Sequence, residues 1–253
     1  KSMIRKASLS QELEYARIYL LLLSNGRLIT VNGETVMARV LCIGDIHLPA
    51  THEDYLGFIK KLKRKYKTDT TVFIGDIVDM HAISYHQKNP ELPSAIDEHE
   101  AVVKGLKAWK KAFPEAYVCI GNHDERVHRL SATAGIPSVY LTDYKELYDT
   151  PGWDWDYDFY IDGVQYIHGT GLSGQQPAFT AAQKLGHSVV MGHVHSVAGV
   201  KIQQTVTKRI FGMNVGCGVD MNHKAMNYSK AHLNKSVISA GIIIDGIPIL
   251  ELL

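Results

Sequence analysis

Cysteine is scarce in this chain, which has only Cys42, Cys119 and Cys217 among its 253 residues. The count is odd and no two cysteines form a CxxC pair, which argues against both a disulfide framework and a zinc knuckle. Each cysteine lies in an apolar or glycine-rich run, where a thiol usually packs as a small hydrophobic group. We therefore expect a protein of the reducing cytoplasm.

Long apolar runs and excess charge are also lacking. The longest unbroken apolar run, Ile18–Leu23, is far shorter than the roughly 20 residues of a membrane-spanning helix, so we expect no membrane span. The net charge is +1, with 27 basic and 26 acidic residues, which provides no global attraction for nucleic acid. The basic run Lys60–Lys67 could follow a phosphate backbone, but its spacing favours the solvated face of an amphipathic helix.

Residues 1–36 differ in pattern from the rest of the chain. Ser10–Tyr19 has helical spacing, and the next residues resemble two strands around an Asn25–Gly26 turn. Met37 then opens what reads as the first strand of a new domain. We interpret residues 1–36 either as an N-terminal appendage or as an upstream leader, and residues 37–253 as the main domain.

From Met37 onward, strand and helix patterns alternate, which indicates right-handed βαβ units and a largely parallel sheet. Helical spacing predicts helices over residues 54–66 and 97–113. After about residue 157, short strands separated by turns predict a second sheet made largely of antiparallel hairpins. The expected fold class is α/β, with two sheets facing each other and helices outside.

Metal-binding side chains directly follow several of the predicted strands. In open α/β sheets, ligands collect at the carboxyl ends of the strands, so these side chains are expected to meet in one crevice. In chain order they are Asp45 and His47 after VLCIG, Asp76 after TVFIG, Asn122 and His123 after AYVCIG, His168 after YI, and His193 and His195 after VVMG.

The residue types in this crevice suit a metal centre. Asp45 and His47 are two residues apart on an extended segment and point to the same side, so both could bind one ion. Asp76 could bridge two divalent cations. Nitrogen and oxygen donors favour manganese, iron, zinc or similar ions over copper(I). Glycines are expected to let the backbone approach the ions at positions 44, 75, 121 and 192.

The motifs GDIH, GDIVD, GNHDE, HG and GHVH stand in this order between residues 40 and 195. In this order they resemble the motifs of the calcineurin-like metallophosphoesterases. The resemblance implies a four-layer αββα double β-sandwich with a dinuclear metal centre at its edge. It also implies an enzyme that hydrolyses phosphomonoesters or phosphodiesters, including nucleotide-like ones, through attack of a metal-bridging hydroxide on phosphorus.

The resemblance further implies two groups of metal ligands that share one aspartate. We expect manganese in both groups, with iron, zinc, nickel or magnesium as alternatives. The groups are Asp45, His47, Asp76 and His195 for one ion, and Asp76, Asn122, His168 and His193 for the other.

Three further residues are candidates for catalysis. By the same resemblance, His123 would protonate the leaving group or steady the phosphoryl oxygens, and Asp79 would orient its imidazole. Arg126 is expected in the first turn of a helix behind GNH, where its guanidinium could meet a phosphate. The alternative for Arg126 is a surface ion pair with Glu125 or Asp124.

Two other functions stay open. The nuclease subunit of double-strand-break repair complexes shares these motifs, but its DNA-capping region follows the GHxH motif, where this chain has only residues 196–253. Some chains of this fold have lost their metals and act as interaction modules, although no ligand position is altered here. Because substrate choice depends on variable loops, residues 126–157 are expected to select the substrate.

Overall fold

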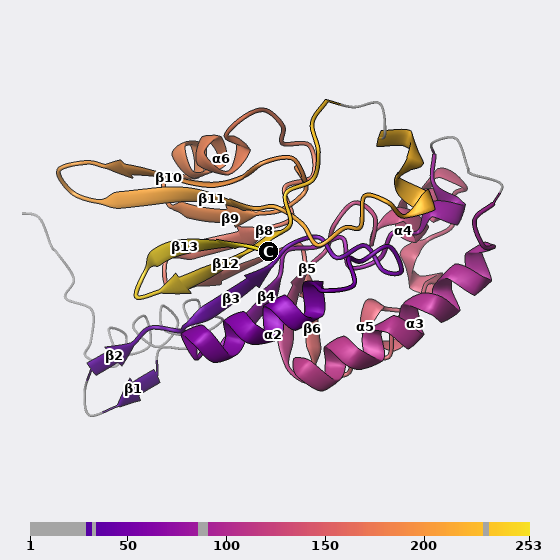
Figure 1. The fold of residues 1–253 in the computed structure, drawn as a ribbon, viewed down its shortest axis with the longest axis horizontal. Helices are drawn as coiled ribbons and strands as arrows, with labels where there is room; N and C mark the ends of the chain where they lie inside the picture. Colours follow the sequence, from indigo (N-terminus) through magenta and orange to yellow (C-terminus); the bar gives the residue numbers. More distant parts are fainter. Residues whose placement is uncertain (1–28, 32–33, 86–90, 230–232) are drawn as a thin grey trace, which may run out of the picture.

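The computed structural model describes residues 29–31, 34–85, 91–229 and 233–253, without the side chains of residues 29–36 and 227–229. Two sheets lie face to face, with helices on the outer face of each (Figure 1). This arrangement confirms the predicted α/β double sandwich. No helix of the described part of the chain is both long and apolar enough to cross a bilayer.

The first sheet has six strands in the order β13-β12-β3-β4-β5-β6. Strands β3 to β6 are parallel, as the βαβ pattern predicts, and β12 is antiparallel to both of its neighbours. Helices α2 (Tyr55–Tyr66) and α3 (Ala95–Ala112) cover the outer face (Figure 1). The strands are β3 (Val40–Ile43), β4 (Thr70–Phe73), β5 (Ala116–Cys119), β6 (Trp153–Asp156), β12 (Ser239–Ile244) and β13 (Ile247–Leu252).

The second sheet has five strands in the order β10-β11-β9-β8-β7, with helix α6 (Pro177–Leu185) on its outer face (Figure 1). Its central strands β8, β9 and β11 run parallel, and only the outer pairs β7-β8 and β10-β11 are antiparallel. The strands are β7 (Asp158–Ile161), β8 (Val164–Ile167), β9 (Ser188–Met191), β10 (Ala198–Gln204) and β11 (Arg209–Val215).

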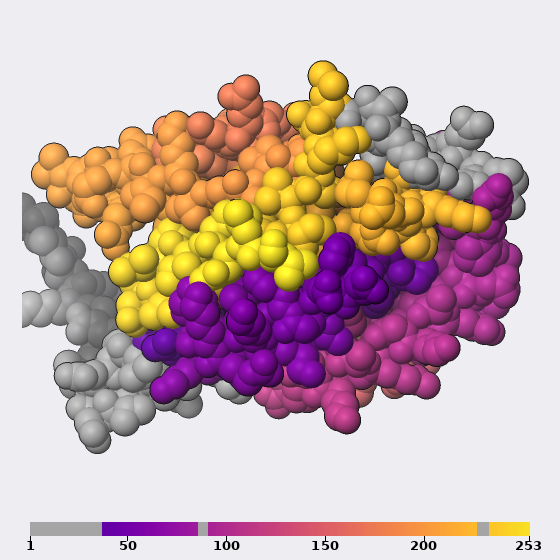
Figure 2. Space-filling view, viewed as in Figure 1, coloured from indigo at the N-terminus to yellow at the C-terminus, as the bar shows by residue number. Residues whose placement is uncertain are grey.

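The prediction that the second sheet consists largely of antiparallel hairpins is therefore wrong. Helix α6 provides a crossover that makes β8 and β9 parallel. In addition, the predicted hairpin near the end of the chain, β12 with β13, joins the first sheet beside β3. Figure 2 shows these C-terminal residues, in yellow, against the indigo residues that begin the main domain.

Two apolar cores lie on opposite faces of the first sheet. In β3, Val40 and Cys42 face the second sheet, whereas Leu41 and Ile43 pack under the helices, as expected from the alternation of side chains along a strand. All of the cysteines are buried and free, as their apolar surroundings predict.

The helices that cover the first sheet agree closely with the predicted ranges. Helix α3 begins with a capping box, in which the Ser94 hydroxyl accepts from the Asp97 amide and the Asp97 side chain accepts from the Ser94 amide. Helix α2 buries Tyr55, Ile59 and Leu62. Its other face carries much of the basic run Lys60–Lys67, which thus lies on a solvated helix surface.

The described N-terminal residues form a separate two-stranded sheet, in which β1 (Ile29–Val31) pairs antiparallel with β2 (Glu34–Val36). The predicted helix over residues 10–19 and the turn at Asn25–Gly26 lie outside the described residues. The division of the chain at residue 37 stays a prediction.

Among the described residues, four short helices lie in the connections that follow β4 and β5 of the first sheet, and a fifth, η3, follows β11 of the second sheet. Their arrangement places helix α4 directly behind the GNH motif, as predicted. They are η1 (His81–Ile83), α4 (Arg126–Thr133), η2 (Ser138–Tyr140), α5 (Tyr144–Leu147) and η3 (Lys224–Ser229).

Candidate metal centre

The predicted metal ligands all lie in loops that leave the carboxyl ends of parallel strands. The first sheet supplies the loops after β3, β4 and β5, and the second sheet supplies the loops after β8 and β9. Since the two sheets face each other, these loops meet at one end of the sandwich.

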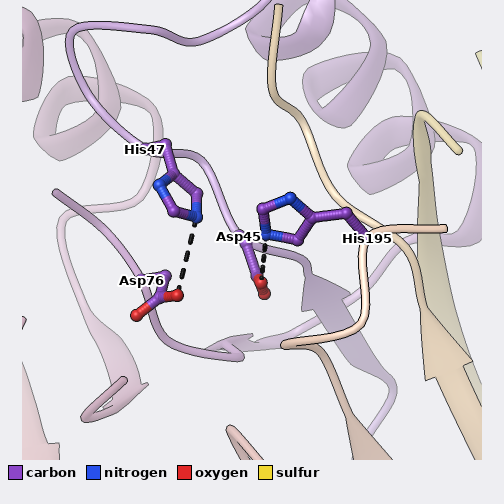
Figure 3. A group of neighbouring side chains, drawn as sticks. All are labelled: Asp45, His47, Asp76 and His195. Atoms are coloured by element: carbon purple, nitrogen blue, oxygen red, sulfur yellow. Dashed lines mark ion pairs between the residues drawn. The ribbon is translucent and has the colours of Figure 1, made fainter. Parts of the chain in front are cut away.

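One group of side chains comprises Asp45, His47, Asp76 and His195. Their nitrogen and oxygen atoms all lie within 4.8 Å of one another, so they could hold a metal ion. His195 Nε2 is 3.0 Å from Asp45 Oδ2, and His47 Nε2 is 3.5 Å from Asp76 Oδ2. Figure 3 shows both imidazole rings pointing toward the carboxylates from different loops.

A second group comprises Asp76, His168 and His193, whose ligand atoms also lie within 4.8 Å of one another. His168 Nε2 is 3.3 Å from Asp76 Oδ2, 3.2 Å from His193 Nδ1 and 3.0 Å from Asn122 Oδ1. Asp76 belongs to both groups, as expected for a carboxylate shared by two ions. The structure thus brings together every side chain that was predicted to bind metal.

The hydrogen bonds of the imidazoles leave lone pairs directed into these groups. His168 Nδ1 donates to the Ile74 carbonyl at 2.8 Å, so in the neutral ring Nε2 carries the lone pair. His47 Nδ1 lies 2.9 Å from Asp79 Oδ1, while its Nε2 is buried with no hydrogen-bond partner among the described residues. A buried nitrogen without a partner is unfavourable, and a cation bound at this point would satisfy it. The residues present therefore fit a metal ion.

The ionisation of the cluster also favours cations. Burial lowers the pKa of His47 and of His193, which keeps these rings neutral, the form that binds metal. For Asp76, burial acts to raise the pKa, but His168, His123 and His47 together hold it well below its usual value. Against the opposing effect of burial, Asp76 and Asp45 raise the pKa of His168 to about 10, so binding of a cation at its Nε2 has to displace a proton. The carboxylates therefore create a negative field at the centre of the site.

Several ligand positions have a left-handed backbone that is uncommon outside glycine. The φ angle is 46° at His47, 47° at Asp76 and 64° at His193. Such conformations persist only where the surrounding structure imposes them, and they are concentrated at functional sites. Here they occur at three of the proposed ligands, in the loops that meet at one end of the sandwich.

Two of the glycines beside the ligands make room for ligand side chains. A Cβ atom at Gly121 would lie 2.1 Å from Asp76 Oδ1, and one at Gly192 would lie 2.2 Å from Asp45 Oδ1. Approach of the backbone to the ions at these glycines stays a prediction.

Asp124 holds two of the loops together, a role that the sequence analysis missed. Its Oδ1 accepts from the Ile77 and Val78 amides at 2.9 and 3.2 Å, and its Oδ2 accepts from the Gly121 amide at 2.9 Å. Burial, reinforced by the charge of Asp76, raises the pKa of Asp124 to about 7. The presence of an aspartate inside the GNHDE motif is the sequence signal that could have indicated this role.

Asp79 lies between the imidazoles of His47 and His123. Its Oδ1 is 2.9 Å from His47 Nδ1 and 3.3 Å from His123 Nδ1. The shortest contact of the His123 ring is to the Asp79 backbone carbonyl, at 2.7 Å from Nδ1. Asp79 therefore contacts His123 as predicted, but mainly through its main chain, and its carboxylate is closer to His47.

Arg126 begins helix α4, as predicted, but its side chain is buried. Its Nη1 donates to the carbonyls of Asp79 and Met80 at 2.6 and 2.9 Å, and its Nη2 is 3.1 Å from His123 Nε2. The alternative of a surface ion pair with Glu125 or Asp124 does not describe this side chain, because it is buried and donates to main-chain carbonyls. Contact between Arg126 and a phosphate stays a prediction.

A cavity of about 410 Å³ contains this centre. Asp76, Asn122, His123, His193 and His195 line one part of it. Residues 126–157, the predicted substrate filter, contribute nothing to its lining. The other lining residues come from later in the chain and are Leu172, Ser173, Val194, Ser196, Met221, Met226, Asn234, Lys235 and Ser236.

A family model described as calcineurin-like phosphoesterase matches residues 38–210 of this chain. No curated protein matches the chain in sequence.

Solved structures show similarity at low sequence identity. Vps29 from Cryptosporidium parvum is 12% identical over 86% of this chain and 97% of its own, with a TM-score of 0.40. A metallophosphoesterase from Sphaerobacter thermophilus is 15% identical over 86% of this chain and 88% of its own, with a TM-score of 0.42. The nuclease MPE from Pseudomonas putida is 13% identical over 88% of this chain and 99% of its own, with a TM-score of 0.36.

Proposed function

This chain belongs to the calcineurin-like phosphoesterase family, and from that premise we propose that it hydrolyses phosphoester bonds with two divalent cations. The observation that carries the proposal is the sharing of Asp76 by two groups of potential ligands, drawn from loops far apart in the sequence. A single shared carboxylate between two nitrogen-rich groups is what a pair of neighbouring cations requires.

We assign Asp45, His47, Asp76 and His195 to one cation, and Asp76, Asn122, His168 and His193 to the other. The donor set of carboxylate, amide and imidazole supports manganese, with iron, zinc, nickel or magnesium as alternatives. When bound, two such cations lower the pKa of water and stabilise negative charge on the attacking and leaving oxygens of a phosphoester.

Asp79 serves both imidazoles in this proposal. Its carboxylate accepts from His47 Nδ1 and so directs the Nε2 lone pair toward the metal position, a support typical of metal-binding histidines. Its carbonyl accepts from His123 Nδ1, so the neutral ring has its lone pair on Nε2, where Arg126 Nη2 lies 3.1 Å away. Proton exchange with substrate through Nε2 therefore requires that the guanidinium give up this contact.

His123 lines the cavity and is the proposed proton donor to the leaving group. Burial acts against its charged form, but Asp76 and Asp79 outweigh burial and raise the pKa of His123. Arg126 holds the carbonyls of Asp79 and Met80, so it keeps this histidine and its acceptor in one place.

The substrate range is tested by one panel of assays. Manganese-loaded protein is incubated with p-nitrophenyl phosphate, bis-p-nitrophenyl phosphate, and single- and double-stranded DNA. We expect release of p-nitrophenol from at least one ester, and loss of that activity in Asp76→Ala. A fully metal-loaded protein that cleaves none of the substrates would contradict the proposal and support a non-catalytic interaction module.

The nuclease alternative is tested by the DNA samples of the same panel. Within the described residues after His195, strands β10 to β13 complete the two sheets, so they do not form a DNA-capping region. We therefore expect small esters to be better substrates than duplex DNA. Cleavage of DNA at low protein concentration would reverse this ranking.

A further inference from the structure

The cavity at the metal centre has a second set of lining residues with a chemistry of its own. Ser173, Ser196, Asn234 and Ser236 offer neutral hydrogen-bonding groups, and Lys235 is the only lysine or arginine among the described residues that line the cavity. Apart from Asp76, these lining residues include no carboxylate. This part of the cavity is therefore suited to an anion.

Main-chain hydrogen bonds fix the segment that carries Lys235 beside the metal centre. The Val237 amide donates to the His195 carbonyl at 2.8 Å, and the Val237 carbonyl accepts from the Cys217 amide at 3.0 Å. Ser236 Oγ donates to Met221 Sδ at 2.9 Å. Lys235 is thus tied through two residues of backbone to the loop of a proposed ligand.

The size of the cavity exceeds the needs of a single phosphate group. At about 410 Å³ it falls within the range of roughly 300 to 1,000 Å³ typical of small-molecule sites. A phosphoester whose phosphorus lies at the metal centre would therefore extend toward the serines and Lys235. The chain has a net charge of only +1, so beyond the proposed cations the attraction for a second anionic group has to come from a local group such as Lys235.

We propose that Lys235 binds a second anionic group of the substrate, so that the preferred substrate is a small nucleotide-like phosphoester carrying a second phosphate. A lysine ammonium is an effective point charge for phosphate oxygens, and hydrogen bonds between charged groups are stronger than those between neutral ones. The inference rests on the proposed function, because it places the reacting phosphoester at the metal centre. Under this inference, Lys235 selects substrates that carry a second phosphate, and hydrolysis takes place at the metal ligands.

Binding of two matched ligands tests the inference without turnover. The probes are phosphonate analogues of thymidine 5′-monophosphate and of thymidine 3′,5′-bisphosphate, in which carbon replaces the ester oxygens so that neither is hydrolysed. By calorimetry on the manganese-loaded protein, we expect the second analogue to bind about tenfold more tightly than the first. In Lys235→Ala the two dissociation constants should agree within about twofold, and Lys235→Arg should retain most of the difference.

Lys60→Ala is the matched control. It removes the same charge from the exposed face of helix α2, so it should keep the wild-type preference for the bisphosphonate. Two results would overturn the inference: a wild type that binds both analogues equally, or a Lys235→Ala variant that keeps the tenfold difference.

Turnover separates this inference from the proposed function. Thymidine 5′-(p-nitrophenyl phosphate) and its 3′-phosphorylated form have the same scissile bond and release the same chromophore. We expect a lower KM for the 3′-phosphorylated form, and an increase of that KM in Lys235→Ala with kcat nearly unchanged. If neither these esters nor those of the assay panel are hydrolysed, the proposed function fails, whereas the binding constants still decide the role of Lys235.

The length of the ligand distinguishes a small nucleotide from the end of a nucleic acid. The phosphonate analogue of a thymidine trinucleotide contains the same groups and additional nucleotides. Because the cavity, at about 410 Å³, is near the lower end of the range for small-molecule sites, we expect the trinucleotide to bind less than threefold more tightly than the bisphosphonate. An increase of thirtyfold or more would overturn the assignment to a small substrate.

Discussion

The two sheets contribute different chemistry to one centre. The first sheet supplies the carboxylates Asp45 and Asp76, whereas the second sheet supplies imidazoles only, those of His168, His193 and His195. The carboxylates are almost fully buried, but the His195 side chain is 21% exposed. The negative charge thus comes from one side of the sandwich, and imidazoles from the other side complete the two coordination groups.

The ligands from the first sheet form one half of the site and those from the second sheet form the other half. The contacts that hold the ligands in place differ between these two halves. In the first sheet, Asp124 joins the loops after β4 and β5, and Asp79 fixes the ring of His47. In the second sheet, the His193 amide donates to Asp45 Oδ2 at 2.9 Å, so this half is positioned by the carboxylates of the first. We infer that the first half defines the centre and that the second half depends on it.

Removal of Asp76 should have the largest effect. Asp76→Ala eliminates the carboxylate that both coordination groups share, so we expect loss of both cations and a fall in turnover of roughly 10⁴-fold or more, since each ~1.4 kcal/mol of lost stabilisation reduces the rate tenfold. Bound metal is measured by elemental mass spectrometry of the acid-digested protein, with circular dichroism to check folding. Retention of one full equivalent of metal would contradict the sharing of Asp76 by both coordination groups.

Removal of His123 should separate chemistry from metal binding. His123→Ala is expected to keep both cations while turnover falls by roughly 10²- to 10⁴-fold, the usual contribution of an acid or base catalyst. Metal content and kcat are measured on the same sample. The control is His187→Ala. It removes an imidazole that is hydrogen-bonded to Gln165 and does not line the cavity. Wild-type turnover in His123→Ala would disprove the assigned role.

Removal of His193 tests the second half alone. Because His193 belongs to one coordination group only, His193→Ala should lose one cation and keep the other, with activity reduced on the order of 10²-fold. Metal equivalents per chain give the answer directly. If both cations are lost, as in Asp76→Ala, the proposed dependence of the second half on the first is incorrect.

Weakening of the hydrogen bond between Asp79 and His47 should have the smallest effect of these changes on the metal centre. Asp79→Asn keeps the shape of the side chain but removes its charge, so His47 is less firmly oriented and metal affinity should decrease by about 10- to 100-fold. Titration with manganese, followed by calorimetry, measures this change. Unchanged affinity together with lower kcat would mean that Asp79 acts only through His123.

The sequence was sufficient to predict the parts that depend on local pattern. Runs of buried strand residues followed by Asp45, Asp76 or His168 located the strand ends, and parallel strands place such ends together. Helical spacing located α2 and α3 within a few residues at each end. These features follow from periodicity and from the geometry of parallel sheets.

The features that were missed depend on contacts between distant segments. Strands β12 and β13 have the same pattern whichever sheet they join, and only the fit of Ile242 into the core beneath the helices places them beside β3. The burial of Arg126 and the position of Lys235 in the cavity lining likewise result from how loops pack together. Such packing cannot be predicted from periodicity in the sequence.

The left-handed backbone at His47, Asp76 and His193 has a consequence for how this fold changes during evolution. Each such residue costs on the order of 1–3 kcal/mol relative to a relaxed conformation, and glycine would relieve most of that cost. In a descendant that no longer needed cations, exchange of these residues for glycine would relieve backbone strain and remove a ligand in the same step. A single substitution at these positions would thus both relax the backbone and end the metal chemistry.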